Sequence, residues 1–150
     1  MKKTSGSIFP YERERNIDLM KVYKELMTQE YYGEDDIRLV RIFSKIAEHP
    51  SKRFWVSEER AAIIMAEIDK GNKLERMRET KREMFFEIHR RVSTLRKQHP
   101  NMPMIQLTTI VCNQPAPKFY LTPKSVKVII YKIKRQWYEE RKKKLKFMFM

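Results

Sequence analysis

The residues best suited to chemistry are basic and tyrosine side chains near the C-terminal end of the chain. Helical spacing of about 100° per residue brings these six cations and two tyrosines onto one helix face. The set comprises Lys124, Lys127, Tyr131, Lys134, Arg135, Tyr138, Arg141 and Lys142. Lysine and arginine bind phosphates, and tyrosine or arginine can reach bases or sugars. The face therefore predicts a nucleic-acid site.

Four residues outside this segment are further candidates for the same interface. Tyr120 follows Lys118 in a proline-rich turn, and we expect its ring to be exposed for contact with the ligand. Arg90 and Arg91 lie in a preceding helix and extend the cationic footprint, although cations near a helix C-terminus are also ordinary partners of the helix dipole. The basic stretch 141–146 is followed by apolar residues, so contact with anionic lipid is an alternative for that segment.

The positive charge of the chain is confined to its second half. Residues 1–75 contain 14 basic and 14 acidic side chains, whereas residues 76–150 contain 19 basic and 5 acidic ones. No acidic residue occurs between Glu87 and Glu139. A solvated surface normally mixes both signs, so this stretch suggests a polyanionic partner. A lysine-rich solvated face in a generally basic proteome is the alternative interpretation.

Catalytic and metal chemistry find little support in the sequence. No spacing brings two of His49, His89 and His99 onto one helical face, and the single cysteine cannot complete a zinc motif. The chain has no glycine-rich phosphate loop and no nucleophile elbow. We therefore expect no catalytic residue, no metal and no cofactor, and we expect a protein that is not an enzyme.

Length and composition predict one soluble, helical body. The 150 residues include only three glycines and a 41% hydrophobic share, which is typical of a well-packed helical chain. The lone Cys112 lies among apolar residues, which predicts a buried thiol and a reducing, cytoplasmic location, nucleoid-associated if the protein binds DNA. The longest apolar run, residues 61–66, is too short to span a bilayer, so we expect no membrane span.

A repeat with a period of 65 residues organises the elements that position these side chains. The segment 50–68 matches 115–133 without gaps, so that Phe54 lies opposite Phe119 and Ser57 opposite Thr122. A duplicated structural unit is the simplest explanation. Each copy is predicted to consist of two helices, an aromatic turn and a third helix. The predicted helices are 12–31, 37–48, 58–70, 73–97, 104–112 and 123–144.

The predicted fold is all-α, with two tandem trihelical, helix-turn-helix-like units joined by a long central helix and packed as one body. This arrangement resembles the trihelical helix-turn-helix DNA-binding proteins, although the interval of about eight residues before each third helix exceeds the usual three or four. Residues 1–71 form the neutral unit, which is structural or contacts a protein partner. Residues 72–150 form the basic, nucleic-acid-binding unit. No oligomeric state is predicted.

The leading functional hypothesis is a non-enzymatic DNA-binding protein, regulatory or architectural, that places its basic C-terminal helix on duplex DNA. One alternative is a structural or scaffold protein of a ribonucleoprotein or viral particle, in which the basic half neutralises an acidic neighbour. A second alternative is an RNA-binding protein that prefers single strands through its tyrosines.

Overall fold

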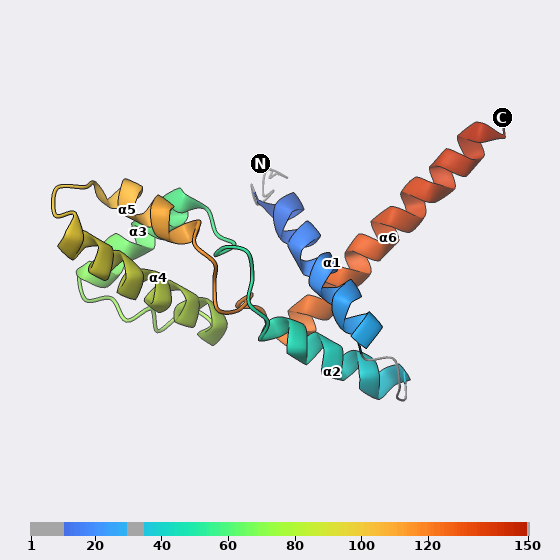
Figure 1. Cartoon of the computed structure of the whole chain (residues 1–150), viewed down its shortest axis with the longest axis horizontal. Coiled ribbons are helices and arrows are strands. Elements are labelled where there is room, and N and C mark those ends of the chain that lie inside the picture. Colours follow the sequence, from blue (N-terminus) through green and yellow to red (C-terminus); the bar gives the residue numbers. More distant parts are fainter. Residues whose placement is uncertain (1–10, 30–34, 150) are drawn as a thin grey trace.

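The main secondary structure of the described residues is α-helix, with non-helical segments between the helices. The computed structural model describes residues 11–29 and 35–149. Its helices are α1 (Glu12–Gln29), α2 (Asp35–Ala47), α3 (Glu58–Asp69), α4 (Glu79–Gln98), α5 (Met104–Cys112) and α6 (Pro123–Met148) (Figure 1). The prediction of an all-α fold is confirmed.

The third helix of each sequence copy begins at a side-chain cap. The Ser57 hydroxyl accepts a hydrogen bond from the Arg60 N–H at 3.1 Å, and the Thr122 hydroxyl accepts one from the Ser125 N–H at 3.1 Å. These bonds satisfy N–H groups that have no partner within the helix. Pro123 stands at the start of α6, where a preset φ favours the helix and no donor is lost. Both predicted starts are confirmed.

The third helix of each copy packs against the first two helices of the other copy. Helix α6 contacts α1 and α2, whereas α3 contacts α4 and α5. Figure 1 shows these two groups on opposite sides of the connecting segments, with the α3–α4–α5 group on the left. Among the described residues, α3 makes no contact with α1 or α2. The tandem grouping of helices predicted from the sequence is therefore not confirmed.

Each three-helix group has its own apolar core. The α1–α2–α6 core consists of Leu19, Met20, Val22, Tyr23, Ile42, Phe43, Ile46, Ala47, Phe119, Val126, Ile130 and Ile133. The α3–α4–α5 core consists of Phe54, Val56, Ala61, Ile64, Met65, Leu74, Met84, Phe85, Ile88, Val92, Leu107, Val111, Cys112, Ala116 and Tyr120. Burial of each large apolar side chain contributes roughly 1.5–3 kcal/mol, so these two cores supply most of the stabilisation.

The two connecting segments, 50–57 and 115–122, meet between the groups. Ser51 and Ala116 form an isolated antiparallel bridge there. Phe54 enters the α3–α4–α5 core and Phe119 enters the α1–α2–α6 core. Each aromatic residue therefore packs in the same core as the third helix that follows it. Phe54 shares a core with α3, and Phe119 shares a core with α6.

The central helix is shorter than predicted. Helix α4 begins at Glu79, six residues after the predicted start at Lys73. The residues before it form turns in which Gly71 has a φ of +96° and Leu74 a φ of +55°. The Leu74 side chain is buried, and its N–H donates to the Asn72 Oδ1 at 2.8 Å. Because a left-handed residue cannot continue an α-helix, the apolar periodicity that includes Leu74 overestimated the length of α4. The longest described helix is α6, at 26 residues.

Candidate nucleic-acid interface

Helix α6 has one end in the core and one end outside it. Val126, Ile130 and Ile133 are buried against α1 and α2, whereas every residue from 134 to 149 is exposed. The 26 residues of α6 correspond to a helix about 39 Å long. Figure 1 shows its C-terminal half extending away from α2 and from the α3–α4–α5 group. The C-terminal half of α6 is therefore available to a partner.

The predicted cations of this helix lie in the solvent. Lys124, Lys127, Arg135, Arg141 and Lys142 are all exposed. In the part of the chain that the structure describes, none of the ten lysines and arginines of α6 forms an ion pair. Like charges held on one helix repel one another, and a phosphate backbone relieves that repulsion by binding them.

The two tyrosines of α6 differ in how firmly they are held. The Tyr131 side chain is 42% exposed, and its ring packs edge-on against Phe43 of α2, with the ring centroids 6.1 Å apart. Lys127 Nζ lies 5.8 Å from the centroid of the same ring. Tyr138 is 62% exposed. Both phenols can therefore reach a partner, and Tyr131 does so from an oriented ring.

Two residues of α6 also contact α1. The Lys134 Nζ donates to the Tyr23 Oη at 2.6 Å and lies 4.7 Å from the centroid of that ring. Lys24 Nζ lies 5.1 Å from the ring centroid of Trp137, which is 43% exposed. Lys134 therefore helps to hold α6 on α1, in addition to carrying one of the charges of the predicted face.

Lys118 lies outside α6 and is paired with acidic side chains. Its Nζ is 3.0 Å from Glu83 Oε1 and 3.4 Å from Glu48 Oε2. The hydrogen bond to Glu83 raises the pKa of Lys118 above its ordinary value. Glu83 belongs to α4 and Glu48 follows α2, so Lys118 links the two three-helix groups. Its charge is already compensated, and its role in the structure is to join these groups.

Tyr120 does not have the exposed ring that the sequence suggested. It is only 8% exposed, and its ring stacks on Phe54 with centroids 6.0 Å apart and an interplanar angle of 18°. Burial is the main cause that raises the pKa of its phenol. The expectation of an exposed Tyr120 was wrong because its packing partner lies 66 residues away in the chain, where local sequence gives no sign of it.

Arg90 and Arg91 share one carboxylate on α4. Glu87 Oε2 lies 2.7 Å from Arg90 Nη2 and 2.7 Å from Arg91 Nε, and the hydrogen bond from Arg90 is the main cause that lowers the pKa of Glu87. Arg91 also donates to the Pro115 carbonyl at 3.0 Å and lies 4.9 Å from the Phe54 ring centroid. Arg91 thus links α4 to a connecting segment. The Arg90 side chain is 66% exposed.

Arg53 is a structural cation that the sequence reasoning did not single out. It is 8% exposed and donates to the carbonyls of Phe54 and Val56 at 2.9 Å each. Its Nη1 lies 3.7 Å from Glu58 Oε2. The repeat contained a signal for this role: Arg53 and Lys118 occupy equivalent positions, and both are paired with carboxylates beside the connecting segments.

The structure therefore brings the eight predicted residues of α6 together on one exposed helix and places the other four candidates elsewhere. Within the described residues, no group of three or more His, Cys, Asp or Glu side chains is arranged to hold a metal ion. No helix in those ranges is both long and apolar enough to cross a membrane. Comparison of the chain with protein-family models, with curated proteins and with solved structures finds no match.

Proposed function

We propose that the protein is a non-enzymatic DNA-binding protein that uses the exposed cationic face of α6 on duplex DNA. The observation that carries this proposal is the ten basic side chains of one projecting helix, none of them in an ion pair with a described residue. Release of condensed counterions from DNA would supply the main driving force for binding.

The dimensions of α6 suit a duplex. The major groove is about 12 Å wide and admits an α-helix. The distance along the helix from Lys124 to Lys146 is about 33 Å, close to one turn of B-DNA, which is about 34–36 Å. The cations are thus distributed over a length comparable with one turn, and Tyr131 and Tyr138 lie among them on the same face.

The two sequence copies would contribute differently to this function. Residues 72–150 supply the binding helix, and residues 1–71 supply α1 and α2, which hold its N-terminal half. At positions equivalent to Lys124, Lys127 and Lys134 in α6, α3 carries Glu59, Ala62 and Asp69. Helix α3 cannot bind phosphates in the same way.

The proposed location is the reducing cytoplasm, with association with the nucleoid in a bacterial cell.

A titration of the purified protein distinguishes this function from the two alternatives. The probes are a random duplex DNA, a single-stranded RNA and heparin, each followed by fluorescence anisotropy. We expect duplex DNA to bind with a Kd in or below about the micromolar range at low salt. Binding to heparin alone would instead support a scaffold protein that neutralises an acidic neighbour. A clear preference for single strands would support RNA binding.

A further inference from the structure

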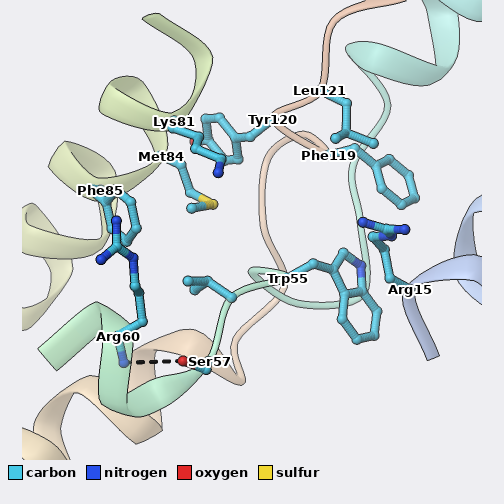
Figure 2. A pocket seen from close by; sticks show the side chains of 11 residues that line it. Arg15, Trp55, Ser57, Arg60, Lys81, Met84, Phe85, Phe119, Tyr120 and Leu121 are labelled. Carbon is cyan, nitrogen blue, oxygen red and sulfur yellow. Dashed lines mark hydrogen bonds between the residues drawn. The ribbon is translucent and has the colours of Figure 1, made fainter. Parts of the chain in front are cut away.

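A cavity of about 390 Å³ lies at the junction of the two three-helix groups. Its walls come from the connecting segments, α1, α3 and α4. Figure 2 shows Met84 and Phe85 on one side of the cavity and Trp55 and Arg15 on the other. The cationic residues of α6 do not line it. The cavity is thus separate from the proposed DNA-binding face.

The interior of this cavity is apolar and rich in aromatic rings. Phe85 and Tyr120 are buried side chains that line it, and Trp55 is a half-buried lining residue. Small-molecule sites in proteins are typically apolar cavities of about 300–1,000 Å³ with a few polar groups that set orientation. A planar ring would find stacking or edge contacts on several sides.

The charged side chains that line the cavity are all basic. Arg15, Arg60 and Lys81 line it, and no aspartate or glutamate does. The three cations come from α1, α3 and α4, so no single helix accounts for them. Arg60 and Lys81 are exposed, and neither forms an ion pair with a described residue. This charge selects an anion over a neutral or cationic ligand.

Arg15 is the most enclosed of the three cations. Its Nη2 donates to Asn16 Oδ1 at 3.1 Å, and its guanidinium is partly buried. Burial is the main cause that lowers the pKa of Arg15 below its ordinary value. The carboxylate of Glu12 acts in the opposite direction, so the charge of Arg15 already has a partner on α1.

We propose that this cavity binds a small organic anion that carries a planar aromatic ring. The ring would lie against Trp55, Phe85 and Tyr120, and the anionic group would interact with Arg60 and Lys81. Nucleotides and aromatic acids share this chemistry. Because the ligand would contact elements of both three-helix groups, its binding would also stabilise their relative placement.

The test uses the full-length Trp137→Phe protein, in which Trp55 is the only tryptophan and its fluorescence reports on the cavity. The protein is titrated separately with adenosine 5′-monophosphate, naphthalene-1-sulfonate, adenosine and inorganic phosphate. We expect at least one of the two ring-bearing anions to bind about tenfold tighter than adenosine and phosphate, because ring and charge act together. Binding of the monophosphate alone would identify a nucleotide site, and binding of the sulfonate alone an aromatic-acid site. If neither anion binds, or if adenosine binds equally well, the proposal is wrong.

Matched variants then locate the binding. We expect the double substitution Arg60→Gln and Lys81→Gln to weaken binding of the anion about tenfold or more. The double substitution Lys70→Gln and Lys97→Gln removes the same charge from exposed positions outside the cavity and should leave binding unchanged. Circular dichroism checks that each variant is folded. Equal binding by both folded variants would overturn the proposal, whether or not α6 binds DNA.

Discussion

Ser51 and Ala116 occupy the same position in the two sequence copies and pair with each other. The Ser51 N–H donates to the Ala116 carbonyl at 3.1 Å, and the Ala116 N–H donates to the Ser51 carbonyl at 3.0 Å. Two equivalent residues that exchange both backbone hydrogen bonds lie on an approximate two-fold axis. From this point each connecting segment leads its third helix to the first two helices of the other copy. The repeat is thus an internal, reciprocal exchange of helices.

The exchange predicts that the two halves depend on each other for folding. A fragment of residues 1–71 keeps α1 and α2 but loses α6, and a fragment of residues 72–150 keeps α4 and α5 but loses α3. Chains of this size, roughly 70–80 residues, have little stability to spare. We expect each fragment alone to show low helicity and an equimolar mixture to regain the helicity of the intact protein. Circular dichroism measures this. Two fragments that each unfold cooperatively on their own, with no gain on mixing, would show that the exchanged packing is unnecessary.

The outward cations of α6 are predicted to control DNA affinity without affecting the fold. Lys124, Arg135 and Lys142 lie within one narrow arc of the helix, and no described residue pairs with them. Their joint replacement by glutamine should weaken duplex binding about tenfold or more at moderate salt, because three phosphate contacts are lost.

The matched control removes three exposed charges elsewhere, by the joint replacement of Lys73, Arg76 and Lys97 by glutamine. Fluorescence anisotropy with one duplex compares the two variants, and both should keep a thermal midpoint within about 2 °C of the parent, as exposed substitutions usually do. Equal loss of affinity in both variants would mean that net charge alone, rather than α6, governs binding.

Cys112 is predicted to resist thiol reagents in the folded protein. Its side chain is fully buried, and burial raises the pKa of the thiol to about 12. The thiolate is the reactive form, so both access and ionisation oppose reaction. With Ellman's reagent at a mildly alkaline pH we expect slow modification in buffer and rapid modification in guanidinium chloride. Rapid reaction in buffer would contradict the buried position.

Asp69 is predicted to make the α3–α4 contact sensitive to acid. It accepts hydrogen bonds from His89 Nε2 at 2.8 Å and Arg96 Nη2 at 3.1 Å, and the bond from His89 is the main cause that lowers its pKa. A carboxyl whose pKa is lower in the folded protein than in the unfolded chain stabilises the folded state at pH values above its pKa in the unfolded chain. This stabilisation is lost as the pH falls below about 4.

The Asp69→Asn substitution isolates this contribution. The partners are partly exposed, so we expect the variant to lose only about 1 kcal/mol or less of unfolding free energy near pH 5. The difference from the parent should be smaller at about pH 2.5 than at pH 5, because protonation of the Asp69 carboxyl removes its charge as the pH falls. Urea unfolding at the two pH values measures it. A difference that is the same at both values would show that the charge of Asp69 makes no contribution.

The sequence predicted where the individual helices lie better than it predicted which helices pack together. The caps at Ser57 and Thr122 located the starts of α3 and α6, because a cap is a local interaction. The buried faces were also readable from apolar spacing. Ala61 and Met65 of α3, however, are equivalent to Val126 and Ile130 of α6. Because both helices present similar apolar faces, apolar spacing alone does not distinguish direct from exchanged packing.

The same limit applied to the candidate site. The exposure of Lys124 and Arg135 followed from the period of their own helix, so local reasoning was sufficient. The surroundings of Lys118 and Tyr120 depend on Glu83 and Phe54, which come from distant parts of the chain. The structural roles of Lys118 and Tyr120 therefore depend on how distant segments pack, which local spacing does not predict.

The salt dependence of duplex binding tests the central claim most directly. If the α6 face contacts five or six phosphates, a plot of log Kobs against log salt concentration should have a slope of roughly −5 for a random duplex. For the Lys124, Arg135 and Lys142 glutamine variant, the slope should be smaller by about 3. A parent slope near −1, or an unchanged slope in the variant, would show that α6 does not bind the phosphates of DNA.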